Sequence, residues 1–255
     1  MNPNSKPNLV LLHGWGFTAA VWDALRPHLA QHFNVTALNL PGYADAAPIE
    51  QMHDLAALAD DVVQRAPLHA TWLGWSLGGM VALQAAAMFP QRVQQLVLVG
   101  STPRFVEEGD WLDAVRKSVL HNFAQELVHA RDSVIGRFLS LQFLGVPGGR
   151  EQARTILAAQ AQDPEPGVLE GGLSILEHAD LRPLLPRIHQ PTLWLTGEKD
   201  RLTPPQAAAH AAASMPNAIA EDWPAAGHAP FLVEPATLAR RVYDFVLDVT
   251  AEQDP

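Results

Sequence analysis

Short apolar runs that alternate with helical stretches limit the folds open to this chain more than any other feature of its sequence. None of these runs alternates cleanly between apolar and polar residues, as expected for central parallel strands that are buried on both faces. Repeated strands and helices predict a mostly parallel sheet with right-handed crossovers and helices on its flanks. We therefore predict an α/β fold. The runs are Leu9–His13, Val35–Leu40, Thr71–Trp75, Leu96–Gly100 and Thr192–Thr196.

The alternation breaks in the middle of the chain. From about Arg104 to Arg182 the pattern is helical, and no further strand is indicated until Pro191 introduces one. The crevice of an open α/β sheet lies at the carboxyl ends of its strands, so a helical insertion at that edge would cover the site as a cap. We predict a core formed by residues 1–103 and 185–255, with a helical cap inserted at residues 104–184.

Composition narrows the classes of function. The 255 residues include no cysteine, which excludes disulfides, thiolate metal sites and a cysteine nucleophile. The first residues do not resemble a signal peptide, and no apolar run approaches the roughly 20 residues that span a bilayer. The formal net charge of −10 argues against nucleic acid as a partner. We expect a cytoplasmic, monomeric protein that has no membrane partner.

The charge is distributed unevenly along the chain. Residues 114–162 contain six basic and three acidic side chains, so this segment carries +3 while the remainder sums to −13. Within it, Arg150 and Arg154 are four residues apart and would share one helix face. Such a face is either an ordinary solvated helix surface or a docking surface for an acidic partner.

A nucleophile motif lies at the end of one predicted strand. Gly74-Trp75-Ser76-Leu77-Gly78 matches G-x-S-x-G, directly after Thr71–Trp75 and before a predicted helix over residues 77–89. A serine on a tight strand-to-helix turn has a strained backbone, and glycines two residues to either side avoid side-chain clashes there. This context favours a catalytic Ser76 in an α/β-hydrolase fold over a chance glycine–serine turn.

The oxyanion hole of such a site takes one backbone N–H from the residue after the nucleophile and another from the loop after an early strand. Leu77 fills the first position. The strand that begins at Leu9 leads into His13-Gly14-Trp15-Gly16, where Trp15 is our candidate for the second donor. We interpret His13 as a structural histidine that braces this loop, because the base of this fold follows the serine in the sequence.

The acid and the base follow the serine in that order in this fold. His228 lies in a loop of small residues after the last strand-like run and before the C-terminal helix, where it can reach Ser76. Asp200 lies just past the strand Thr192–Thr196 and would orient His228 and stabilise its imidazolium. Glu198 is the nearest rival for the acid; Asp222 lies inside the last strand-like run and is a weaker one.

Several segments together resemble a known family. His13-Gly14-Trp15-Gly16, Gly74-Trp75-Ser76-Leu77-Gly78-Gly79 and Gly227-His228-Ala229-Pro230-Phe231 look like those of the pimeloyl-acyl-carrier-protein methyl ester esterases of biotin synthesis. The predicted cap adds Arg137-Phe138-Leu139-Ser140-Leu141-Gln142, which is similar to the cap helix of that family. The resemblance extends over nearly the whole chain from Leu9 onward.

The resemblance implies hydrolysis of the methyl ester of a pimeloyl chain that is attached to acyl carrier protein. It also implies that the acidic carrier docks onto arginines of the cap that match the family's positions, which are Arg137, Arg150 and Arg154. It implies a set of substrate-binding positions as well, two of which belong to the triad. They are Trp15, Ser76, Leu77, Phe138, Leu139, Ser140, Leu141, Gln142 and His228. The basic segment agrees independently with an acidic partner.

These features predict a serine esterase that acts through an acyl-enzyme on Ser76 and needs no metal or organic cofactor. Two alternatives remain open. The same triad would serve a general carboxylesterase for small soluble esters without a carrier protein. A non-enzymatic binding module on a hydrolase scaffold would fail to react with a fluorophosphonate.

Overall fold

A computed structural model gives the fold of residues 6–143, 146, 148–151, 153, 154, 164 and 167–253, with no account of the side chains of residues 128, 131, 132, 139, 141, 142 and 250–253. Its centre is a six-stranded, all-parallel sheet with the order β2-β1-β3-β4-β5-β6. The strands are β1 (Asn8–Leu12), β2 (Asn34–Leu38), β3 (Ala70–Trp75), β4 (Val93–Val99), β5 (Thr192–Gly197) and β6 (Ala218–Trp223). The predicted α/β fold with a parallel central sheet is confirmed.

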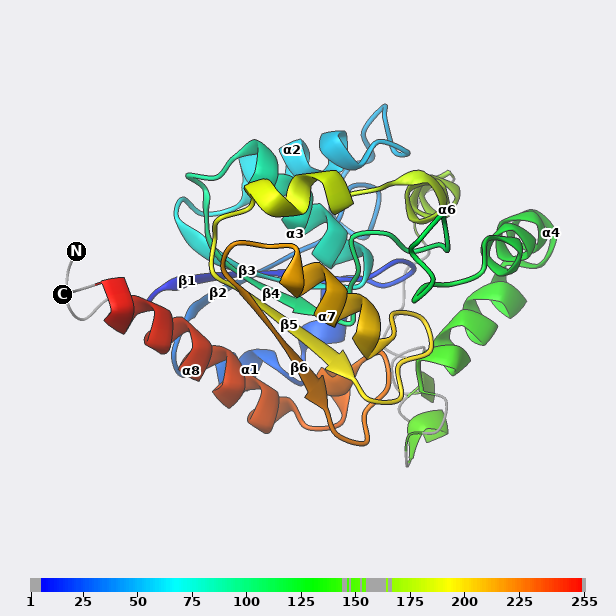
Figure 1. Cartoon of the computed structure of the whole chain (residues 1–255). Coiled ribbons are helices and arrows are strands. Elements are labelled where there is room, and N and C mark those ends of the chain that lie inside the picture. Colours follow the sequence, from blue (N-terminus) through cyan, green and yellow to red (C-terminus); the bar gives the residue numbers. More distant parts are fainter. Residues whose placement is uncertain are drawn as a thin grey trace.

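Helices lie on both faces of this sheet (Figure 1). The helices are α1 (Arg26–Leu29), α2 (Leu55–Arg65), α3 (Leu77–Met88), α4 (Lys117–Gln142), α6 (Val168–His178), α7 (Pro205–Ala213) and α8 (Pro235–Gln253), with short 3₁₀ helices at Ala19–Trp22, Arg182–Arg187 and Pro230–Leu232. Among the helices so described, none is both long and apolar enough to cross a bilayer.

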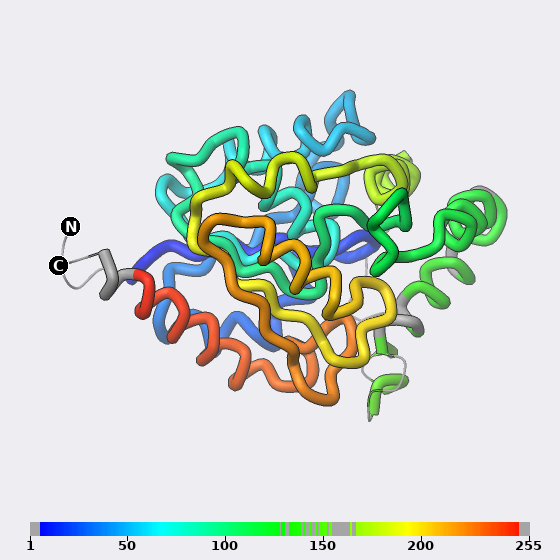
Figure 2. Tube along the Cα trace, viewed as in Figure 1, coloured from blue at the N-terminus to red at the C-terminus, as the bar shows by residue number. Residues whose placement is uncertain are grey.

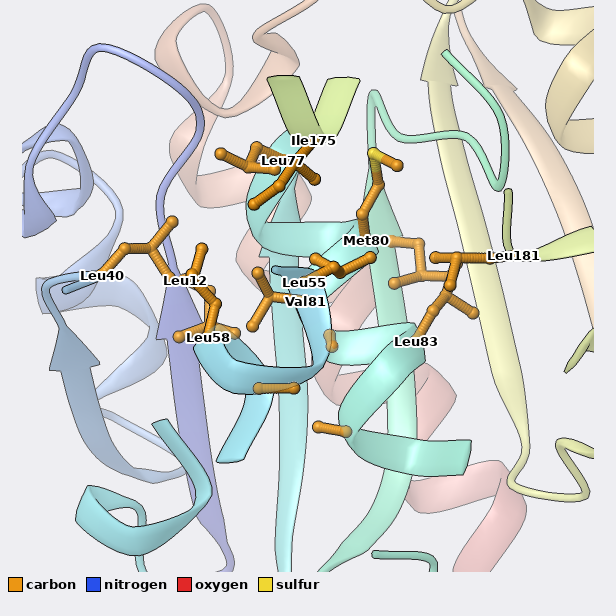
Figure 3. Close-up of a cluster of buried hydrophobic side chains, with 14 of the residues drawn as sticks. Leu12, Leu40, Leu55, Leu58, Leu77, Met80, Val81, Leu83, Ile175 and Leu181 are labelled. Carbon is orange, nitrogen blue, oxygen red and sulfur yellow. The ribbon is translucent and has the colours of Figure 1, made fainter. Parts of the chain in front are cut away.

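Two hydrophobic clusters form because successive strand residues point to opposite faces. Val10 and Leu12 of β1 join the cluster beneath α2, α3 and α7. Leu9 and Leu11 join the cluster on the other face, beneath α1 and α8. Figure 3 shows part of the first cluster, where Leu12 meets Leu55, Leu58 and Val81. Burial on both faces explains why the strand sequences lack polar–apolar alternation.

The chain between β4 and β5 forms α4 and α6 and adds no strand to the sheet among the residues described there. Both helices lie beyond the end of the sheet to which the strand arrowheads point (Figure 1), and the tube of Figure 2 shows the chain in the same view. The backbone of Ala130 (φ −145°, ψ 48°) interrupts α4, which therefore consists of two helical parts. This segment coincides with the predicted cap at residues 104–184, and the three-part division of the chain stays a prediction.

Candidate active site

Ser76 lies on a strained turn between β3 and α3. Its backbone has φ 55° and ψ −119°, a combination that few non-glycine residues adopt. The Ser76 amide donates to the carbonyl of Val99 at 3.1 Å, and Ser101 Oγ donates to the carbonyl of Ser76 at 2.9 Å. A Cβ at Gly74 would collide with backbone of residues 78 and 79, so only glycine fits there. The turn is therefore held by β4 and the loop that follows it.

His228 and Asp200 lie in the loops that follow β6 and β5. His228 Nδ1 is 2.8 Å from Asp200 Oδ2, and both side chains are buried. The rivals for the acid lie elsewhere. Glu198 is exposed and accepts a hydrogen bond from the amide of Ala225 at 3.1 Å, and Asp222 belongs to β6. Of these three carboxylates, Asp200 is the one bonded to His228.

The atoms through which serine and histidine would react are unengaged. Among the described residues, neither Ser76 Oγ nor His228 Nε2 has a hydrogen-bond partner, and both atoms are buried. The end of β3 holds the histidine loop, because Trp75 Nε1 donates to the carbonyl of His228 at 2.8 Å. The loop after β4 approaches it too: a Cβ at Gly100 would lie 3.1 Å from His228 Nδ1. With Nδ1 bonded to Asp200, Nε2 is free to accept a proton.

The loop after β1 brings Trp15 to the same end of the sheet. A Cβ at Gly14 would lie 3.2 Å from Ser76 Cβ, so this loop runs beside the serine. No described residue accepts a hydrogen bond from the amide of Trp15 or of Leu77. Both predicted oxyanion donors therefore border Ser76 with their N–H groups uncommitted, Leu77 as the first residue of α3.

His13 is structural in its contacts, as the sequence suggested. Its Nε2 accepts a hydrogen bond from the Leu40 amide at 2.9 Å, so Nδ1 carries the proton and donates to the carbonyl of Gly14 at 2.9 Å. Complete burial lowers the pKa of His13 to about 4, against the smaller raising effect of its bond to Gly14. A neutral His13 thus fixes the loop that carries Trp15.

The predicted cap residues separate into two groups. Phe138 is buried and packs edge-on against Trp15 with ring centroids 4.8 Å apart. Ser140 is exposed, and its Oγ donates to the carbonyl of Gly136 on its own helix. The side chains of Leu139, Leu141 and Gln142 lie outside the described residues. The structure therefore brings Phe138, and not Ser140, next to the candidate oxyanion loop.

Trp15 links the core to the cap through a second contact. Its Nε1 donates to the carbonyl of Leu169 in α6 at 2.8 Å. The candidate docking arginines lie on the surface: Arg137 pairs with Glu126 and lies over the ring of Phe123 at 5.4 Å, and Arg150 and Arg154 are exposed. Three cationic side chains of the basic segment are thus at or near solvent.

Two hydroxyl groups at this site were missed by the sequence analysis. Ser101 holds the carbonyl of Ser76, and Thr203 Oγ1 donates to Asp200 Oδ2 at 2.7 Å. Thr203 lies three residues after Asp200, and this closeness in sequence is the one signal that pointed to it. The described residues also contain no group of three or more histidine, aspartate or glutamate side chains arranged to hold a metal ion.

Comparison with known proteins agrees with this geometry. Residues 7–235 match the sequence profile of the alpha/beta hydrolase fold family, so the chain is an α/β hydrolase. A solved esterase from Exiguobacterium antarcticum superposes with a TM-score of 0.86 at 22% identity, covering 95% of this chain and 92% of that chain. At that identity the likeness concerns the fold.

Sequence relatives are more specific. A pimeloyl-[acyl-carrier protein] methyl ester esterase of Klebsiella pneumoniae is 42% identical over 231 residues, which are 90% of this chain and 89% of the relative. Relatives of the same name from Yersinia enterocolitica and Xanthomonas oryzae are each 40% identical, covering 93% and 95% of this chain and 92% and 96% of their own length. The chain belongs to the pimeloyl-[acyl-carrier protein] methyl ester esterase family.

Proposed function

We propose that this protein is a serine carboxylesterase that hydrolyses the methyl ester of a pimeloyl group attached to acyl carrier protein, as its relatives' names indicate for them. The observation that carries the chemistry is the buried His228–Asp200 pair at 2.8 Å, beside a buried serine hydroxyl that no described residue engages. Ser76 is the nucleophile, His228 the base and Asp200 the acid that orients it.

The reaction proceeds in two steps. His228 Nε2 takes the hydroxyl proton as Ser76 Oγ bonds to the ester carbonyl carbon, and the carbonyl electron pair moves to the oxygen. This pair then re-forms the C=O bond, and methanol leaves with the proton that His228 returns. Water, deprotonated by the same nitrogen, next attacks the acyl-enzyme, and Ser76 recovers its proton as the free carboxylate departs.

The amides of Leu77 and Trp15 stabilise the negative oxygen in both steps. Both N–H groups are free of acceptors among the described residues, and that of Leu77 opens α3, where the helix dipole favours negative charge. Each donor of this kind contributes about 3 to 4 kcal/mol to the transition state. The proposal thus assigns a role to two backbone groups that protein contacts leave uncommitted.

The cap supplies the acyl and carrier contacts in this proposal. Trp15, Phe138 and Phe123 form a run of aromatic rings with successive centroids 4.8 Å and 6.3 Å apart, an apolar surface that suits a methylene chain. Arg137, Arg150 and Arg154 provide positive charge for an acidic carrier in a protein whose net charge is −10. We further propose that the enzyme is a monomer and that it acts in the cytoplasm, a reducing compartment with which a sequence that contains no cysteine is compatible.

The first test compares pimeloyl-carrier methyl ester with a free short methyl ester. Ser76→Ala should abolish hydrolysis of both. Arg150→Ala/Arg154→Ala should lower kcat/KM about tenfold or more for the carrier-linked ester alone, because two charge-assisted contacts are lost. Arg26→Ala/Arg240→Ala removes two exposed arginines from α1 and α8, on the other side of the sheet, and should change neither.

The outcomes separate the alternatives. If the carrier-linked ester is no better a substrate than the free ester and the cap arginines have no effect, the protein is a general carboxylesterase. If wild type hydrolyses neither ester and does not react with a fluorophosphonate, the hydrolase scaffold serves as a binding module.

A further inference from the structure

Thr203 has a hydroxyl buried between the two residues of the His228–Asp200 pair. Its Oγ1 lies 2.7 Å from Asp200 Oδ2 and 3.4 Å from His228 Nδ1, and the residue is 1% exposed. We propose that Thr203 is a positioning residue for the reaction: its hydroxyl holds the carboxylate oxygen that orients His228. This inference rests on the proposed function.

Four donors surround the Asp200 carboxylate and fix its plane. Oδ1 accepts the amides of Leu202 at 2.8 Å and Thr203 at 3.0 Å, while Oδ2 accepts the Thr203 hydroxyl and His228 Nδ1. The two amides and the hydroxyl all come from the three residues that follow Asp200. The carboxylate therefore keeps its orientation without any help from the histidine.

The threonine also favours one tautomer of His228. A hydroxyl can donate one hydrogen bond, and that of Thr203 is donated to Asp200 Oδ2 at 2.7 Å. The lone pairs of the Thr203 oxygen therefore face His228 Nδ1 at 3.4 Å. A protonated Nδ1 is attracted to those lone pairs, and an unprotonated one is repelled. Nδ1–H is thus stabilised twice, and Nε2 stays unprotonated for Ser76.

Loss of the hydroxyl should loosen the carboxylate. Oδ2 would then keep His228 Nδ1 as its donor, and Asp200 would be held by the two amides on Oδ1. A carboxylate that can rotate orients His228 less well, which lowers the rate.

Other charged groups near the pair do not account for this effect. Glu198, Lys199 and Arg201 lie on the same loop as Asp200 with exposed side chains, and the approach from β4 is made by Gly100, which carries no charge. From β3, Trp75 contacts the backbone carbonyl of His228. The hydrogen bonds to the Asp200 carboxylate come from Leu202, Thr203 and His228.

The test uses the full chain and a short p-nitrophenyl ester, so that it does not depend on the carrier. Thr203→Val should lower kcat/KM about threefold to tenfold, the size of one buried hydrogen bond. Thr203→Ser keeps the hydroxyl and should restore the rate.

Thr196→Val is the matched control. Thr196 is buried in β5, and its Oγ1 has no partner among the described residues, so the same chemical change should move neither the rate nor the His228 Nδ1–H resonance. Thr203→Ala removes the hydroxyl without a new methyl group, and gives the measurement if valine prevents folding. The downfield proton resonance of His228 Nδ1–H should shift in both hydroxyl-free variants.

An unmoved Nδ1–H resonance in the valine and alanine variants would overturn the inference, whatever the loss of rate. Ser76→Ala, assayed on the same ester, keeps the two proposals apart. Full activity of that variant contradicts the proposed nucleophile. An inactive Ser76→Ala beside a silent Thr203→Val contradicts the role of Thr203 alone.

Discussion

His13 is an ionisable residue whose burial determines both its protonation and its role. The imidazole joins the Leu40 amide to the Gly14 carbonyl, so it needs one nitrogen protonated and one bare. A second proton would remove the acceptor for Leu40 and place a charge in the core. Burial therefore keeps the pKa of His13 at about 4, below the ordinary histidine value of 6.5.

This shift predicts a loss of stability in mild acid. Between pH 6.5 and about 4 the unfolded chain binds a proton at His13 that the folded protein does not bind, so the unfolding free energy falls as the pH falls. The share of His13 is about 3 kcal/mol when the whole window has been crossed. Urea unfolding followed by tryptophan fluorescence, at several pH values above 4, measures it.

His13→Gln is the comparison for this measurement. The glutamine amide can accept from Leu40 but does not titrate, so this variant should be about 1 to 2 kcal/mol less stable near pH 7 and should lose less on acidification. Other acid-sensitive groups, such as Asp180, whose pKa the Arg182 side chain lowers, are common to both proteins. Parallel stability curves for wild type and variant would show that His13 makes no contribution.

At the scale of elements, α6 carries two adjacent glycines that bring it close to the core. A Cβ at Gly171 would lie 2.6 Å from the carbonyl oxygen of Met52, and one at Gly172 would lie 2.5 Å from Cδ1 of Trp15. Each glycine costs the helix about 1 kcal/mol relative to alanine. The contact they allow includes the hydrogen bond from Trp15 to Leu169 in α6.

We expect Gly172→Ala to displace α6 from the Trp15 loop and to lower kcat/KM several-fold, because that loop supplies a proposed oxyanion donor. The Trp15 side chain cannot simply turn aside, since its Nε1 is bonded to Leu169. Gly136→Ala is the control, because a Cβ there meets nothing within 4 Å. It should leave activity unchanged and stabilise α4 by up to about 1 kcal/mol. Equal kinetics for both variants would rule out the proposed coupling.

The strands were predictable to within a few residues, and the differences have local causes. We predicted the fourth strand as Leu96–Gly100, whereas β4 begins at Val93 and ends at Val99. The polar residues at the start of β4 hid its true beginning from the sequence pattern. Gln95 is buried there, and its side-chain oxygen accepts a hydrogen bond from Thr71 at 2.8 Å. Gly100 has φ +49° and leaves the strand. The edge strand β6 is buried at its last residue only and includes the charged residues Glu221 and Asp222, so its pattern is weak.

The site was predictable where a motif fixes local geometry, and unpredictable where distant loops meet. Between a predicted strand and a predicted helix, G-x-S-x-G predicts the turn at Ser76 from the local sequence alone. The contact of His13 with Leu40, and that of Trp15 with Phe138, join residues that are far apart in the sequence. Such pairs depend on how the loops and the cap pack, which no local pattern encodes.

At the scale of the whole molecule, the distribution of charge bears on how an acidic carrier could approach. Residues 114–162 carry +3, and the rest of the chain carries −13. In water without salt the overall negative charge would repel an acidic partner. At physiological ionic strength the Debye length is about 8 Å, so a partner that faces the cap is influenced mainly by the nearby arginines.

Salt should therefore affect the two substrates differently. Between about 0.05 and 0.5 M salt, we expect kcat/KM for the carrier-linked ester to fall, because screening weakens the attraction of the cap arginines. The value for a free short methyl ester should stay constant. In Arg150→Ala/Arg154→Ala the dependence should flatten or reverse, since repulsion between two acidic proteins is what salt then screens. If this variant and wild type show the same slope, the attraction arises elsewhere on the surface, and the docking site must be sought outside the cap.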